Sequence, residues 1–174
     1  MITGDKDVFA IECKKRKEYS EMRLYIEEKD ILQYEYKDMI NRYRWYNFDD
    51  IVEWLEENLK YILSFDDGPI EPNVKNAIKF IIKCQKDSNT DISLSESISD
   101  WCFRHGWLNA RAGSFLASLI FRRVNNYIEI SWNNSNSYRG NPKFIYDEGC
   151  YYIDIDIFKE VMMSFIDYYK NKQI

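Results

Sequence analysis

The stretch FRRVNNYIEISWNN, residues 121–134, has strand-like segments on both sides of an Asn-Asn pair. Asparagine tolerates the positive φ angles of a tight turn, so Asn125 and Asn126 predict a two-residue hairpin turn. Counting outward from this turn places Arg122 opposite Glu129. The stretch therefore predicts a hairpin in which one face carries an Arg122–Glu129 pair. The other face is apolar and carries Leu119, Phe121, Ile130 and Trp132.

The two adjacent arginines raise the question of an anion-binding or nucleic-acid-binding site. A cross-strand ion pair is worth roughly 0.2–1 kcal/mol, and it accounts for Arg122 without a ligand. The stem of Arg123 can cover apolar surface near the turn while its guanidinium reaches water. We interpret both arginines mainly as parts of the hairpin.

Further strands are predicted on both sides of this hairpin. Residues 8–13 and 22–28 alternate in polarity and are expected to pair across a polar connection that contains the basic run 14–17. A third strand is expected at 31–36, whereas 37–47 fits either a helix or an edge strand. A second hairpin is expected at 143–155, with its turn at Asp147–Gly149.

Four helices are predicted from 3.6-residue periodicity and end signals. They cover 48–63, 73–86, a segment that ends at His105, and 157–172. For the third helix, Ser93 and Glu96 fit a capping box and Gly106 fits a left-handed stop; Asp156 is expected to cap the fourth. Residues 64–72 are the most linker-like segment. We expect a single α+β domain over 1–174, in which hairpins form an antiparallel sheet and three or four helices pack on it.

Composition narrows the possible partners. The 174 residues carry a formal net charge of -5, and 17% of them are aromatic, including 14 tyrosines. An acidic chain favours soluble or basic partners over nucleic acid, and tyrosine suits contact surfaces. We see no signal peptide and no apolar run that could span a membrane. The four scattered cysteines are expected to be reduced, which favours a cytoplasmic location.

Catalytic signatures are missing from the sequence. No G-x-S-x-G, Walker or G-x-G-x-x-G pattern occurs, and His105 is the only histidine. Asp154 and Asp156 could hold a magnesium ion in a nuclease, but a strand edge followed by a helix cap explains them as well. We therefore expect no catalytic residues, no metal and no cofactor, and we keep an enzyme that uses His105 or this aspartate pair as the weakest hypothesis.

Charge is distributed unevenly over the two central helices. Helix 73–86 carries lysines at 75, 79, 83 and 86, whereas helix 48–63 and the segment after it are acidic. An acidic surface can steer a basic protein toward it. The candidate partner-binding residues are Asp49, Asp50, Glu53, Glu56, Glu57, Asp66 and Asp67.

An alternative site is suggested by the arginines and aromatic residues of the region 101–123. These side chains could line a pocket for an anionic ligand. The candidate residues are Trp101, Arg104, His105, Trp107, Arg111 and Arg123.

Two stretches resemble known bacterial proteins. ITGDKDVFAIE (2–12) resembles the start of small immunity proteins from bacterial polymorphic toxin systems. FRRVNNYIEISW (121–132) is similar to a strand-turn-strand segment of bacterial proteins from toxin–immunity and defence neighbourhoods. The resemblance implies a cytoplasmic protein that binds and neutralises a cognate toxin without chemistry of its own, and it assigns no contact residue. The alternative is a phage-encoded or defence-related module that recognises a host complex or an anionic small ligand.

Overall fold

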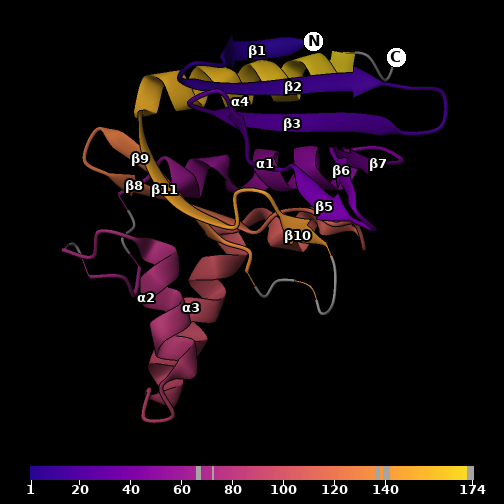
Figure 1. The fold of residues 1–174 in the computed structure, drawn as a ribbon. Coiled ribbons are helices and arrows are strands. Elements are labelled where there is room, and N and C mark those ends of the chain that lie inside the picture. The colour runs from indigo at the N-terminus through magenta and orange to yellow at the C-terminus, as the bar shows by residue number, and fades with distance from the viewer. Residues whose placement is uncertain (66–67, 72, 136–137, 139–141, 172–174) are drawn as a thin grey trace.

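The computed structural model describes residues 1–65, 68–71, 73–135, 138 and 142–171, and it confirms the α+β class (Figure 1). Within these residues, eleven strands in antiparallel sheets are combined with four α-helices. The strands are β1 (Ile2–Asp5), β2 (Phe9–Lys15), β3 (Ser20–Ile26), β4 (Lys29–Asp30), β5 (Tyr34–Tyr36), β6 (Met39–Asn41), β7 (Tyr43–Trp45), β8 (Leu119–Val124), β9 (Tyr127–Asn133), β10 (Lys143–Phe144) and β11 (Glu148–Asp154). The helices are α1 (Asp49–Ile62), α2 (Ala77–Lys86), α3 (Ile92–His105), the 3-10 helix η1 (Trp107–Arg111) and α4 (Ile155–Asn171).

The N-terminal sheet has the order β1-β2-β3-β4, and β7 also pairs with β3. Its central β2–β3 hairpin confirms the pairing expected between 8–13 and 22–28. Met22, Leu24 and Ile26 are all buried, as their alternation predicted. The ambiguous segment 37–47 forms β6 and β7 and no helix. The strand expected at 31–36 is shorter, because Ile31 and Leu32 are buried outside any strand before β5 begins.

A second sheet has the order β11-β9-β8, and its β8–β9 hairpin has the predicted register. Arg122 pairs with Glu129, and the turn places Asn125 at a φ of 55°. The expected face of Leu119, Phe121, Ile130 and Trp132 is buried in the main core. The sequence of FRRVNNYIEISW thus contains enough local information to set both the turn and the pairing.

The hairpin predicted at 143–155 is wrong. β11 pairs with β9 across the sheet, and β10 pairs instead with β5 in a small sheet of order β10-β5-β6. Gly149 explains part of this pairing, since a Cβ atom there would lie 2.1 Å from Cζ2 of Trp132 in β9. The glycine permits close strand-to-ring contact and does not form the tight turn that the sequence suggested.

The helices confirm the predicted periodicity but correct several ends. α2 begins at Ala77 and not at 73, because the Asn76 side chain accepts a hydrogen bond from the Lys79 amide. The N-cap of α3 is Asp91, whose carboxylate accepts from the Ser93 amide, so the capping box at 93–96 is wrong. Asp154, and not Asp156, caps α4 by accepting from the amide of Asp156 at 2.9 Å.

The end of α3 is correct in position but not in conformation. The helix ends at His105, yet Gly106 has a φ of -118°, which is not left-handed. Gly106 is needed for space, since a Cβ atom would lie 2.9 Å from Cδ1 of Ile120. The backbone of α3 therefore approaches the edge of the second sheet closely, and Gly106 forms an isolated bridge with Ile120.

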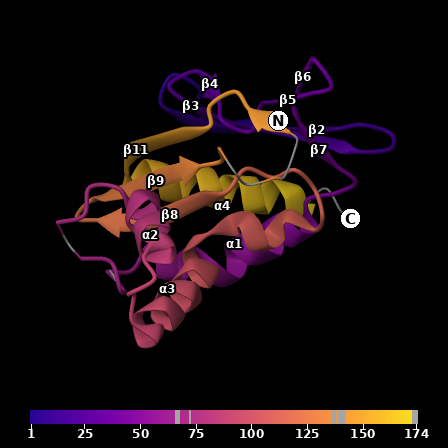
Figure 2. The same cartoon turned by 60° about the horizontal axis from the view of Figure 1, so that its bottom comes forward.

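Two apolar clusters cover the two faces of the second sheet. The main core joins both large sheets through α4, whose Phe158 ring lies 5.6 Å from Phe9 in β2 and 5.6 Å from Phe121 in β8. The second cluster packs α2 and α3 on the opposite face, around Trp101 and Ile120. In Figure 1 this helix pair projects from the body of the molecule, and Figure 2 shows α1 and α4 side by side.

Packing of α2 on the second sheet changes the environment of the Arg122–Glu129 pair. The sequence predicted the cross-strand pair but not its burial: Arg122 is 1% exposed and Glu129 is 0% exposed. Arg122 Nε donates to Glu129 Oε2 at 2.9 Å, and the Ala77 amide of α2 donates to Glu129 Oε1 at 2.6 Å. This buried carboxylate therefore connects the sheet to the first turn of α2.

Candidate functional site

The acidic side of α1 faces solvent. Asp50, Glu53 and Glu57 are exposed and recur at spacings of three and four residues, which places them on one side of the helix. The opposite side carries Ile51, Val52, Leu55 and Ile62, all buried in the core. This amphipathic division is the reason that the carboxylates gather on one surface.

Two of the predicted acidic residues have local partners. Asp49 is half-buried, and its Oδ2 accepts a hydrogen bond from Asn47 Nδ2 at 2.5 Å. Glu56 Oε1 lies 2.5 Å from Lys170 Nζ of α4. In the part of the chain that the structure describes, Asp50, Glu53 and Glu57 form no ion pair. Asp66 and Asp67 lie outside the described residues.

α4 runs antiparallel to α1 and extends the acidic surface. At one end the Phe48 amide donates to Tyr169 Oη at 2.7 Å. At the other end, both helices meet the β8–β9 turn, because Arg123 donates to the Leu63 carbonyl and the Ile155 amide donates to the Asn126 carbonyl. The exposed side of α4 adds three carboxylates, Asp156, Glu160 and Asp167, together with the exposed Met163.

We call this surface the acidic helix face. It consists of Asp50, Glu53, Glu56 and Glu57 of α1 and Asp156, Glu160 and Asp167 of α4, interrupted by Lys60, Lys159 and Lys170. The sequence analysis missed the contribution of α4. The acidic spacing along α4 could be seen in the sequence, but only the antiparallel packing beside α1, with Glu56 paired to Lys170, brings the two acidic rows next to each other.

The alternative anion-binding residues are not gathered in one place. Trp107 is 0% exposed in the main core, where its Nε1 donates to the Ala117 carbonyl at 2.7 Å. Arg123 instead caps the end of α1, since its Nη1 donates to the Leu63 carbonyl at 2.7 Å and its guanidinium lies over Phe65. Arg104 lies over the ring of Tyr61, and Arg111 is exposed on η1.

His105 and Trp101 belong to the second apolar cluster and its border. Their rings stack with centroids 4.1 Å apart, and His105 Nδ1 lies 3.0 Å from the Trp101 carbonyl oxygen. With 1% of its surface exposed, His105 has no access to a substrate. The six residues therefore have separate structural roles, and the structure does not assemble them into one anion pocket.

The catalytic alternatives gain no support from geometry. Asp154 is used as a helix cap, and no group of three His, Cys, Asp or Glu side chains within the described residues could hold a metal ion. The four cysteines are free, and burial raises the pKa of the Cys13 thiol to about 12 and that of Cys102 to about 11. These thiols are protonated at neutral pH and are therefore poor nucleophiles.

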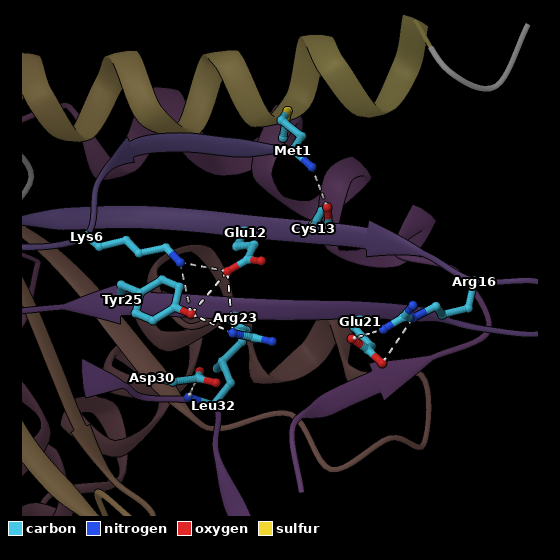
Figure 3. A network of polar contacts seen from close by, with 10 residues as sticks. All are labelled: Met1, Lys6, Glu12, Cys13, Arg16, Glu21, Arg23, Tyr25, Asp30 and Leu32. Atoms are coloured by element: carbon cyan, nitrogen blue, oxygen red, sulfur yellow. Dashed lines mark hydrogen bonds and ion pairs between the residues drawn. The ribbon is translucent and has the colours of Figure 1, made fainter. Parts of the chain in front are cut away.

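The outer face of the N-terminal sheet carries a polar network (Figure 3). Glu12 Oε2 lies 3.0 Å from Lys6 Nζ and 3.6 Å from Arg23 Nη1, and it accepts a hydrogen bond from Tyr25 Oη. These contacts lower the pKa of Glu12, although burial acts in the opposite direction. Next to this network, Asp30 Oδ1 accepts from the Leu32 amide at 3.2 Å.

Asp30 is expected to make stability pH-dependent. Burial raises the pKa of its carboxyl to about 6, against an ordinary value near 3.8. The folded state therefore binds a proton that the unfolded chain has lost, so stability from this group is greatest below about pH 4 and falls as pH rises to about 6. Relative to Asp30→Asn, wild type should lose about 2–3 kcal/mol of unfolding free energy across this interval.

The measurement for Asp30 is urea unfolding of both proteins between these pH values. Asp100→Asn, which changes an exposed carboxyl on α3, is the matched control and should follow wild type at every pH. Parallel pH profiles for Asp30→Asn and wild type would show that this carboxyl is not the titrating group.

Among the helices of the described residues, none has the length and apolar character needed to cross a membrane. In comparisons with family models, curated proteins and solved structures, the chain matches none of them.

Proposed function

We propose that this protein is an immunity or inhibitor protein that binds a cognate toxin and occludes its functional surface. The observation that carries the proposal is the acidic helix face, on which Asp50, Glu53 and Glu57 are exposed and form no ion pair within the described residues. Like charges held on adjacent rigid helices produce a field that attracts a basic partner. The resemblance of 2–12 and 121–132 to immunity and defence proteins supports the same role.

The chemistry of such a partner follows from this surface. A toxin that acts on nucleic acid presents a basic active surface, and an acidic inhibitor competes there with phosphate groups. Exposed apolar side chains near the carboxylates, such as Met163, supply contact area that charge alone does not. Helices suit this task because their backbones are already ordered before the partner arrives.

A charge-reversal experiment tests the proposed surface. Asp50→Lys, Glu53→Lys and Glu57→Lys together should slow association with the toxin by roughly 10–100-fold, and added salt should reduce the difference from wild type. Stopped-flow or surface-plasmon measurements against the purified toxin give the rate. The control is Glu18→Lys, Glu96→Lys and Asp100→Lys, which makes the same change in net charge at exposed positions elsewhere.

Two different measurements test the immunity role and the proposed binding surface independently. Growth rescue of cells that express the toxin tests the immunity role, and the association rate tests the acidic helix face. Rescue combined with equal rates for the two triple variants would remove this face from the mechanism. Failure of the wild-type protein to bind or neutralise any toxin encoded beside it would overturn the immunity role itself.

A further inference from the structure

A hollow of about 300 Å³ lies between the outer face of the N-terminal sheet and the β5–β6 hairpin. Its lining residues are Glu21, Gln33, Ile40, Asn41, Arg42 and Arg44. Arg42 and Arg44 stand on either side of Tyr43 in the chain, and Tyr43 is 1% exposed. Because side chains alternate along extended backbone, both arginines leave the chain on the side opposite the core and border the same space.

Neither arginine has an ion-pair partner in the described part of the chain. Glu21 is the cross-strand neighbour of Arg44 in the β3–β7 pairing, so it is the expected counter-charge. Its carboxylate is instead held by Arg16, with Nε–Oε1 at 3.3 Å and Nη2–Oε2 at 3.4 Å (Figure 3). The Arg44 guanidinium lies 5.8 Å from the Tyr19 ring centroid, which is a contact that leaves its charge uncompensated.

The carboxylate of Asp30 lies outside the lining of the hollow. Arg42 acts on Asp30 electrostatically and favours its ionised form, but burial is the larger effect and raises the pKa of Asp30 to about 6. Asp30 is 9% exposed and does not line the hollow. Asp30 is mostly ionised at neutral pH and offsets part of the arginine charge from outside the hollow, but it forms no ion pair with Arg42 or Arg44 in the described residues.

We propose that Arg42 and Arg44 form a binding site for a phosphate group. Guanidinium groups bind phosphate oxygens through paired hydrogen bonds, and two of them match the charge of a mono- or diphosphate better than that of a single carboxylate. The Gln33 side chain adds an amide donor, while the Asn41 amide is held by the Met39 carbonyl at 2.7 Å. The volume is near the lower limit for small-molecule sites.

The acidity of the whole chain does not argue against this site. Residues 1–47 contain ten lysines and arginines and ten aspartates and glutamates, so the net charge of -5 arises entirely from residues 48–174. The phosphate could belong to a free nucleotide or to a nucleic-acid backbone, which share the same chemistry. This site lies on a different surface from the acidic helix face, so it does not depend on the proposed toxin binding.

Titration calorimetry at low ionic strength with two probes, pyrophosphate and a single-stranded oligonucleotide, tests the site. Arg42→Gln and Arg44→Gln should each weaken binding roughly tenfold, which is the usual effect of losing one charge-assisted contact. Lys83→Gln, which removes one exposed charge from α2, should not change it. Arg16→Gln should also weaken binding, because it releases Glu21 to pair with Arg44, whereas Glu21→Gln should preserve or strengthen it.

The two probes distinguish the sources of phosphate. Arginine-dependent binding of pyrophosphate identifies a site for free phosphate ligands, and arginine-dependent binding of the oligonucleotide alone identifies a nucleic-acid site. The proposal is overturned if neither probe binds, or if binding is the same in Arg42→Gln, Arg44→Gln and wild type. Both side chains are exposed, and unfolding curves of each variant verify that the fold is retained.

Discussion

Replacing Glu129 with alanine should lower the free energy of unfolding by about 3–5 kcal/mol, because it leaves the buried Arg122 guanidinium without its counter-charge. Arg122 Nη2 lies 2.5 Å from Glu129 Oε2, and the Val74 carbonyl would remain as its acceptor. The Ala77 amide would lose its acceptor as well. Both losses occur where no solvent replaces them, since Arg122 is 1% exposed and Glu129 is 0% exposed.

Urea unfolding followed by circular dichroism measures this loss of stability. Two further variants serve as comparisons for Glu129→Ala. Glu56→Ala breaks the exposed pair with Lys170 and should cost no more than about 1 kcal/mol. Arg122→Met combined with Glu129→Leu should cost less than Glu129→Ala alone, because no unpaired charge remains buried. Equal losses for Glu129→Ala and Glu56→Ala would contradict the burial of the pair.

Replacing Trp107 with alanine should cost about 3–5 kcal/mol of stability, the range for removing a large buried aromatic side chain. Trp107 is 0% exposed, and its ring meets Phe121 edge to face with centroids 5.5 Å apart. The substitution leaves a cavity beside the β8 strand and an Ala117 carbonyl without its indole donor. The expected loss is therefore one of packing and of one hydrogen bond.

The same denaturation experiment separates this structural role from a role in ligand binding. Tyr46→Ala removes an aromatic ring that is 76% exposed, and it should change stability by less than about 0.5 kcal/mol. A Trp107→Ala protein with wild-type stability would show that the ring is not part of the core. In that case Trp107 would again be a candidate residue of the anion-binding pocket that the sequence suggested.

Local patterns in the sequence were sufficient to predict many of the helices and strands. The Asn125–Asn126 turn and the alternation around it predicted the β8–β9 register, and 3.6-residue periodicity predicted α1 and the buried side of α4. These elements are specified by residues within a few positions of one another, so the interactions that form them can be predicted from a short stretch of sequence. The predicted starts of α2, α3 and α4 were less accurate. Several polar residues near each start could cap the helix, and the structure uses Asn76, Asp91 and Asp154.

Strand pairings between distant segments could not be predicted from the sequence. β11 pairs with β9, and β10 pairs with β5, so that Ile153 and Phe144 enter the core beside strands that are not their neighbours in a local hairpin. The segment 143–155 contains a plausible turn of its own, and nothing local shows that distant partners offer better burial. Non-local pairing depends on the sum of many side-chain contacts, which a single stretch does not contain.

The same distinction between local sequence and tertiary packing applies to the candidate sites. The sequence by itself determined that one side of α1 is acidic and that Arg122 faces Glu129, because helix and hairpin geometry place those side chains. Only the tertiary structure decided that α4 extends the acidic surface, that α2 buries the Arg122–Glu129 pair, and that Arg42 and Arg44 border one hollow. Exposure and counter-charge are properties of the packed assembly of elements, and they arise only when segments far apart in the chain come together.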